Sequence, residues 1–279
     1  ELWDSNLFQI SIDESSNHQQ FFRTQIEENV PPNILNSGTI SHTQTWSQET
    51  NYDRTGIVRV PDSGNGPFPV LILLHGASGN ASSYINRYSS FTNYIRVALQ
   101  GYDPPPSGSI NGNSGWNIRS EGTKANDIDF LLNIINQIKS YDNVDSSNIT
   151  LIGSSNGGGL VNKATIELPI DTFKNSISIA SQLFEDAYHD NSFWYNPNGI
   201  GNYTATISPD QGRRILSIHA TGDNTIPYDG GQTWLNNGGF YPAQESIYIL
   251  AGAMGYQGDQ LLSDAGENTN TPSGFTKYS

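Results

Sequence analysis

The chain has 279 residues, of which 35% are hydrophobic, and its aromatic residues (14 Tyr, 11 Phe and 5 Trp) are numerous enough to build a core. This composition excludes a wholly disordered chain. The net charge of −14 disfavours nucleic acids and anionic membranes as partners. The absence of cysteine excludes disulfides, thiolate nucleophiles and cysteine-based zinc sites.

The first 48 residues differ in composition from the rest. They are rich in Asp, Glu, Gln, Asn and His, and Phe8 to Ile12 alternates as a strand does. We expect residues 1–48 to form an N-terminal extension packed on the core, and residues 49–279 to form the main domain. The chain starts at Glu1 without an initiator Met, which favours a processed N-terminus and an exported protein, extracellular or periplasmic.

Strands and helices alternate along the main domain. Apolar and β-branched runs predict strands at 54–61, 68–74, 94–99, 149–153, 175–180 and 214–220, with a further strand starting near Phe275. Helical spacing predicts helices at 81–90, 121–139, 160–168 and 244–256. This order indicates an α/β fold with a mostly parallel sheet and helices on both faces. No apolar run approaches the roughly 20 residues that a membrane span needs.

Two long segments interrupt the pattern. Gly101 to Arg119 is a loop rich in Gly and Pro that carries Trp116. Residues 181–210 are rich in aromatic side chains and are expected to form a lid-like insertion, with Trp194 and Tyr195 near its middle. Loops of this length are often functional. Trp116, Trp194 and Tyr195 are therefore candidates for a substrate cleft, although aromatic residues in long loops more often pack the loop down.

The most informative motif is Gly153-Ser154-Ser155-Asn156-Gly157, which lies between a predicted strand and a predicted helix. This is the setting of a nucleophile elbow, in which small neighbours allow a serine hydroxyl to project from a sharp turn. The first N–H groups of the following helix point toward whatever the serine attacks. Asn156 would thus supply one oxyanion donor.

Two further polar stretches follow predicted strands. His75-Gly76-Ala77 comes directly after the strand at 68–74, and Asp223 follows the strand at 214–220. Ligands bind at the carboxyl ends of parallel strands, so both stretches are expected at the same sheet edge as Ser155. Asp127 and Asp129 begin a predicted helix, where carboxylates favour the helix dipole, and a metal role for them is disfavoured.

These stretches together resemble the α/β-hydrolases, and more closely the branch with polyhydroxybutyrate depolymerases, feruloyl esterases and acetyl xylan esterases. The resemblance covers roughly residues 50–260 and rests most on Ser155-Asn156-Gly157-Gly158 and on Asp223 to Gly231. It implies that Ser155 is the nucleophile and Asp223 the triad acid. It also implies oxyanion donors at Ala77 and Asn156, with His75 and Gly76 as the supporting loop, and no cofactor or metal.

The sequence departs from the family pattern at the catalytic histidine. In α/β-hydrolases the triad order is Ser, acid, His, and no histidine follows Asp223 here. Three explanations remain open. The histidine lies beyond Ser279, or the triad is lost and the protein binds without catalysis, or another histidine has replaced it, with His189 the best candidate. His75 and His219 are more readily explained as structural residues.

The resemblance therefore implies a secreted serine carboxylic ester hydrolase. Feruloyl or acetyl esters and polyesters, small or polymeric, are the expected substrates. We expect a monomer without nucleic-acid partners or membrane spans. A catalytically inactive hydrolase fold used for binding is the alternative, and a peptidase shares the same triad.

Overall fold

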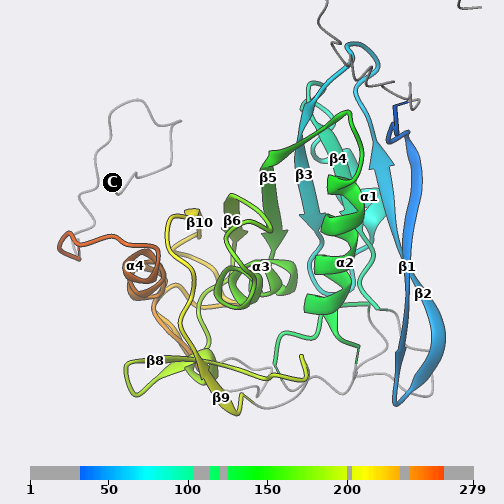
Figure 1. The fold of residues 1–279 in the computed structure, drawn as a ribbon. Coiled ribbons are helices and arrows are strands. Elements are labelled where there is room, and N and C mark those ends of the chain that lie inside the picture. The colour runs from blue at the N-terminus through cyan, green and yellow to red at the C-terminus, as the bar shows by residue number, and fades with distance from the viewer. Residues whose placement is uncertain (1–31, 103–113, 120–124, 200–202, 233–238, 261–279) are drawn as a thin grey trace, which may run out of the picture. The chain divides into compact units, whose positions relative to one another are not determined.

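The computed structural model describes residues 32–102, 114–119, 125–199, 203–232 and 239–260. All of these residues belong to one compact unit, Pro32–Ser279. Its centre is a seven-stranded sheet in the order β1-β2-β4-β3-β5-β6-β10 (Figure 1). The strands are β1 (Gly38–Trp46), β2 (Glu49–Arg59), β3 (Phe68–Leu74), β4 (Ile95–Leu99), β5 (Val144–Ser154), β6 (Asn175–Ile179) and β10 (Arg214–Ile218).

Strand direction divides this sheet into two parts. The β1–β2 and β2–β4 pairs are antiparallel, whereas β4, β3, β5, β6 and β10 run parallel to one another. In the parallel part, Leu74 pairs with Gly153, Ser154 with Ile179, and Ile179 with Ile218. Because these strands end in register, the loops that follow them begin at one edge of the sheet.

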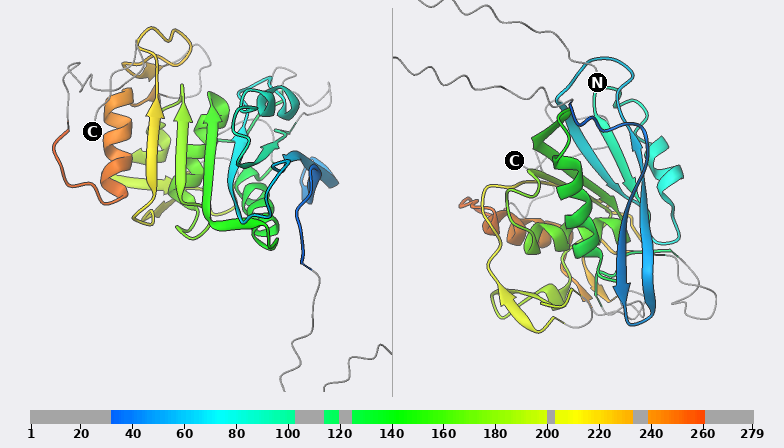
Figure 2. Two further views of the ribbon diagram at one scale, coloured as in Figure 1. Left: turned by 90° about the horizontal axis from the view of Figure 1, so that it is seen from above. Right: turned by 45° about the vertical axis from the view of Figure 1, so that its right-hand side comes forward.

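Helices cover both faces of the sheet. They are α1 (Ala81–Asn86), α2 (Asp127–Lys139), α3 (Asn156–Glu167) and α4 (Ala243–Ala253). The ribbon views place α2 and α3 in front of the sheet, and α1 on the other side (Figures 1 and 2). Alternate residues of β3 pack into the two resulting cores, with Ile72 on the α2–α3 side and Leu73 on the α1 side. Burial on both faces explains why β3 is apolar throughout.

The described residues of 181–210 form a short 3₁₀ turn and a small sheet. The turn is η1 (Glu185–Ala187), and the antiparallel sheet consists of β7 (Tyr188–His189), β8 (Ser192–Tyr195) and β9 (Ala205–Ile207). A two-stranded ribbon joins β11 (Gly231–Gln232) to β12 (Gly239–Phe240). None of the described helices is long and apolar enough to cross a membrane.

The described strands and helices agree with the predicted α/β architecture, and β3 has the predicted bounds. The N-terminal boundary differs, because Gly38–Trp46 is the first strand of the main sheet and not part of an extension ending at 48. Its sequence, GTISHTQTW, is mostly polar because β1 lies at the sheet edge with many exposed residues. The predicted strands at 8–12 and from 275 lie outside the described residues.

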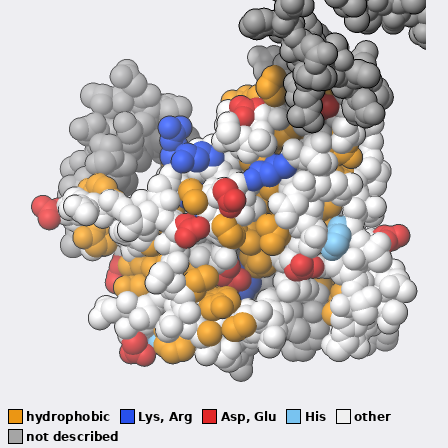
Figure 3. Space-filling model, in the orientation of Figure 1, with side chains coloured by type: hydrophobic (Ala, Val, Ile, Leu, Met, Phe, Trp, Pro, Cys, Tyr) orange, Lys and Arg blue, Asp and Glu red, His pale blue; other side chains and the backbone are white. Residues whose placement is uncertain are grey.

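The face shown in Figure 3 is mixed in character. Acidic side chains are scattered over it, and the basic side chains lie mainly in its upper part. Apolar side chains show between them across the middle of the face.

Candidate active site

Ser155 lies in a sharp turn between β5 and α3. Its backbone has φ 53° and ψ −121°, a conformation that is costly for a residue with a side chain. The turn is held by the Ser155 N–H, which donates to the Ile179 carbonyl at 2.8 Å. The flanking glycines are required, because a Cβ at Gly153 would overlap the backbone of Gly157, and one at Gly157 would overlap the Leu74 carbonyl. The predicted elbow geometry is therefore present.

The loop after β3 lies directly against this serine. A Cβ added at Gly76 would stand 3.4 Å from the Ser155 Cβ and 3.2 Å from the Ser154 carbonyl oxygen. The next residue, Ala77, carries the first candidate oxyanion N–H. Asn156 carries the second, and as the first residue of α3 its N–H has no partner within the helix. The two candidate N–H groups thus come from separate segments, the loop that lies against Ser155 and the first residue of α3.

His75 braces the Gly76–Ala77 loop. It is 1% exposed, and its Nε2 accepts a hydrogen bond from the Gly101 N–H at 3.0 Å. Because Nε2 is an acceptor, the proton lies on Nδ1, which donates to the Gly76 carbonyl at 2.7 Å. Burial lowers the pKa of the imidazole, so the neutral form is favoured. Both ring nitrogens are occupied, so His75 is not placed to take a proton from Ser155.

Asp223 lies in the loop after β10. Its Oδ1 accepts the N–H groups of Thr225 at 2.8 Å and Ile226 at 3.0 Å. Gln182, which follows β6, holds the same loop by donating from Nε2 to the carbonyls of Pro227 and Tyr228 at 3.0 and 3.1 Å. The Asp223 side chain is 18% exposed, and its Oδ2 stands 3.6 Å from His219 Nε2. The carboxylate is therefore fixed through one oxygen, while the other is less engaged.

None of the histidines in the described residues forms a hydrogen bond with Ser155. His219 is buried and its Nε2 faces the Ile226 carbonyl at 2.9 Å, which makes it a support of the acid loop. His189 is 44% exposed, pairs with Asp190 at 3.0 Å and stacks on Trp194. His42 lies on β1, 3.9 Å from Asp129. His18 lies outside the described residues.

The three aromatic cleft candidates lie in different surroundings. Trp116 is 1% exposed, so its ring packs the loop down and forms no wall of an open cleft, contrary to the cleft role considered for it. Trp194 and Tyr195 are half-buried on β8, where the Trp194 indole N–H donates to the His189 carbonyl at 3.2 Å. The candidate role of Trp194 and Tyr195 in a cleft stays a prediction.

Sequence reasoning missed a buried ion pair beside the site. Asp127 was expected only as a helix N-terminal carboxylate, but it meets Arg54 at 2.5 Å, with both side chains 1% exposed. The sequence alone does not indicate this pair, because the two residues lie on different elements, α2 and β2. No cluster of three or more His, Asp or Glu residues in the described part of the chain could hold a metal ion.

Three features occur together in this structure. They are the strand order, the strained serine between β5 and α3, and the two polar loops beside that serine. The strand-turn-helix around Ser155, with its two N–H-bearing loops, is the arrangement of the nucleophile elbow. The fold is that of an α/β-hydrolase.

Comparisons with known proteins agree with the resemblance to the esterase branch of the α/β-hydrolases. No family model matches the chain. Feruloyl esterase B of Piromyces equi is 26% identical over 225 residues, which cover 77% of this chain and 38% of that protein. The chain thus spans well under half of this curated relative.

Solved structures align with the chain at lower sequence identity. A poly(3-hydroxybutyrate) depolymerase from Bordetella parapertussis aligns with a TM-score of 0.48 at 13% identity, covering 78% of this chain and 77% of that one. A thermostable esterase aligns with a TM-score of 0.44 at 18% identity, covering 78% and 52%.

Proposed function

We propose that the protein is a carboxylic ester hydrolase that works through an acyl-enzyme on Ser155. The observation that carries the proposal is the strained Ser155 turn with the Gly76–Ala77 loop packed against it. Strain of this kind persists where the surrounding structure holds a functional geometry. The 26% identity to a feruloyl esterase supports the same reaction class.

The reaction follows from the arrangement. The Ser155 hydroxyl attacks the ester carbonyl carbon while its proton passes to a general base. The N–H groups of Ala77 and Asn156 stabilise the resulting oxyanion, and its collapse expels the alcohol, which takes up the proton from the base. Water then attacks the acyl-enzyme in the same way, releasing the carboxylic acid and restoring the serine. No cofactor takes part.

The base in this proposal is a histidine oriented by the less engaged oxygen of Asp223. We place it outside the described residues, because His75 and His219 are buried and hydrogen-bonded elsewhere. His189 is the alternative within the described part of the chain. Its Asp190 neighbour could orient it as a triad acid does, but Trp194 covers one ring face.

Feruloyl or acetyl esters are the proposed substrates, with polyesters as the second class. The resemblance of the elbow and acid loop to that esterase branch supports this choice, as does the feruloyl esterase relative. Secretion remains part of the proposal, supported by the acidic composition, and it is tested by locating the natural gene product.

The deciding experiment is the intact mass of the full-length natural gene product before and after treatment with a fluorophosphonate probe. One adduct, mapped to Ser155, is expected. Ser155→Ala should abolish it, whereas Ser154→Ala, the neighbouring serine of the same motif, should retain it. Absence of any adduct, together with no hydrolysis of p-nitrophenyl acetate, would overturn the proposal and favour a binding protein.

A second measurement assigns the base. The 279-residue chain is treated with the same probe, alone and as His189→Ala. An adduct that disappears in His189→Ala would assign the base to His189. An adduct formed only by a longer gene product would place the base beyond Ser279.

A further inference from the structure

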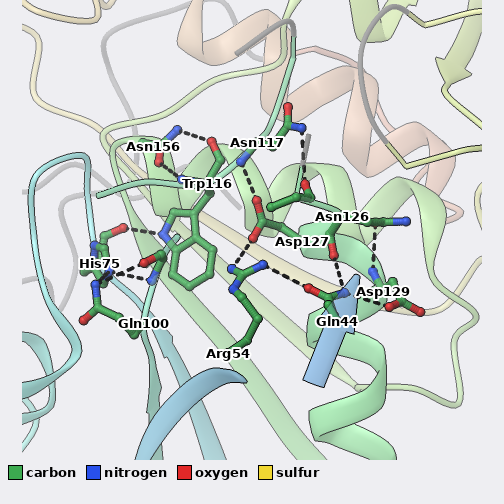
Figure 4. Close-up of polar contacts among 12 residues, drawn as sticks. Gln44, Arg54, His75, Gln100, Trp116, Asn117, Asn126, Asp127, Asp129 and Asn156 are labelled. Carbon is green, nitrogen blue, oxygen red and sulfur yellow. Dashed lines mark hydrogen bonds and ion pairs between the residues drawn. The ribbon is translucent and has the colours of Figure 1, made fainter. Parts of the chain in front are cut away.

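We infer that residues 114–119, which we call the strap, hold the two oxyanion loops at a fixed separation, with the Asn156 side chain as the positioning residue that couples them. The inference rests on the proposed function for its catalytic consequence. The strap is a short irregular segment between the sheet edge and α2, and it contacts both loops that carry a candidate oxyanion donor (Figure 4). These loops follow different strands, β3 and β5.

The first set of strap contacts reaches the loop that carries Ala77. The Ser78 N–H donates to the Ser114 carbonyl at 2.7 Å, and the Ser114 hydroxyl donates to the Gly79 carbonyl at 2.5 Å. The Trp116 indole N–H donates to the His75 carbonyl at 2.8 Å. Three hydrogen bonds thus fix the loop on both sides of Ala77.

The second set reaches the serine elbow through one side chain. Asn156 Oδ1 accepts the Trp116 backbone N–H at 2.7 Å, while its Nδ2 donates to the Trp116 carbonyl at 3.0 Å (Figure 4). An amide side chain can satisfy both backbone groups because it carries a donor and an acceptor. The residue whose backbone N–H faces the oxyanion is therefore clamped to the strap by its own side chain.

The strap is anchored at its far end by the buried ion pair. The Asn117 N–H donates to Asp127 Oδ2 at 2.5 Å, and the other oxygen of Asp127 meets Arg54 at 2.5 Å. Arg54 also donates to Gln44 at 3.1 Å and stacks over the Phe130 ring at 4.3 Å. A charge-assisted, fully buried anchor gives the strap a fixed position on β2 and α2.

The physical consequence concerns the geometry of the oxyanion hole. Donors stabilise a developing charge when they are held at the correct place before the reaction, and displacements of about 1 Å cost large factors in rate. Loss of a whole donor costs about 10²–10³ in kcat. Because release of the clamp loosens the donors without removing one, we expect a smaller loss of about 10–100-fold in kcat, with KM nearly unchanged.

The test compares two asparagines with the same bonding geometry. Asn143 clamps Leu35 as Asn156 clamps Trp116, with Oδ1 accepting the Leu35 N–H at 2.9 Å and Nδ2 donating to its carbonyl at 3.0 Å. Asn143 precedes β5, at the opposite end of the strand from Ser155. Asn143→Ala therefore removes the same pair of bonds without touching the site.

Hydrogen–deuterium exchange on the full chain gives a readout that does not depend on activity. Asn156→Ala should raise exchange in residues 75–80 and 114–119, although Asn156 makes no side-chain hydrogen bond to 75–80 in the described structure. Asn143→Ala should raise it only around residues 33–36. Equal exchange at 75–80 in Asn156→Ala and wild type would overturn the inference.

Kinetics on the same variants test the catalytic part. The rate of fluorophosphonate labelling and kcat for an ester should fall in Asn156→Ala and stay unchanged in Asn143→Ala. Trp116→Phe, which removes the indole N–H bond to the His75 carbonyl together with part of the buried ring, repeats the test at the loop after β3 if Asn156→Ala does not fold. If wild type fails to label, the proposed function fails, while the exchange experiment still decides whether the strap couples the loops.

Discussion

The two sides of the candidate site are held in very different ways. On the oxyanion side, one connected set of buried and part-buried hydrogen bonds links His75, Trp116, Asn156 and Asp127. On the acid side, Asp223 is fixed through one oxygen, and no histidine in the described residues lies beside the other oxygen within hydrogen-bond distance. The proposed oxyanion side is thus held in place by contacts that do not involve a base, so the two proposed roles are structurally separable.

This difference predicts which substitutions disturb only their own contacts and which disturb several groups of the site. On the oxyanion side each side chain serves several partners, so a single change displaces a whole network. On the acid side a change should reduce the rate while the oxyanion loops stay in place. The following predictions use this contrast.

The largest expected effect is on the acid side. Asp223→Asn should lower kcat by about 10⁴-fold, because an amide no longer orients and stabilises the protonated base. Steady-state ester hydrolysis measures it, and exchange at residues 75–80 should match wild type. Asp229→Asn, an exposed carboxylate in the same loop, is the control. Activity within tenfold of wild type would show that Asp223 is not the triad acid.

The next effect is on the oxyanion side and appears in stability. Asp127→Asn should lower the free energy of unfolding by about 3–5 kcal/mol, because it leaves Arg54 charged and unpaired in the core. Urea unfolding measures the loss. Asp129→Asn, in the same helical turn but 48% exposed, should cost about 1 kcal/mol. The double variant Arg54→Met/Asp127→Leu should recover much of the loss, and failure to do so would contradict the ion-pair explanation.

The pH dependence of stability should also report on the oxyanion side. Burial lowers the pKa of His75 in the folded protein, whereas in the unfolded chain it titrates near its ordinary value of 6.5. Below this value the unfolded chain binds more protons, so stability should fall as the pH is lowered. Urea midpoints between pH 7.5 and 5 should show a shallower fall in His75→Gln. His42→Gln is the control, and an unchanged slope in His75→Gln would refute the assignment.

The smallest expected effect lies on the acid side. Gln182→Ala removes two hydrogen bonds from the Asp223 loop, which should lower kcat about tenfold and stability by about 1–2 kcal/mol. Gln182→Met keeps the length of the side chain but removes the donors without adding a charge, so it should behave similarly. Activity assays and thermal unfolding measure both variants. A loss as large as that of Asp223→Asn would mean that Gln182 contacts the reacting groups.

The sequence predicted the parts of the fold in which burial shapes composition. β3 is apolar at every position because both of its faces are buried, and its bounds were correct. The glycines around Ser155 signalled the elbow because only small residues allow that close approach. In contrast, β1 and the first half of β5 are polar and exposed, so their periodicity did not distinguish them from loops.

The contacts that build the oxyanion side could not be predicted in the same way. Asn156 and Trp116 are 40 residues apart, and Arg54 and Asp127 are 73 apart. Each residue alone has an ordinary explanation, as a helix start, a loop aromatic or a surface charge. The residues of each pair meet only in the folded chain, where residues 114–119 and α2 bring them together. A single sequence does not show which residues pair in this way.

The backbone conformation of Ser155 has a consequence for the stability of the protein. A non-glycine residue at φ 53° and ψ −121° costs on the order of 1–3 kcal/mol, so glycine at this position would give a more stable protein. Most proteins stand only slightly above the stability they need. The serine therefore occupies this position at a cost in stability that glycine would not carry.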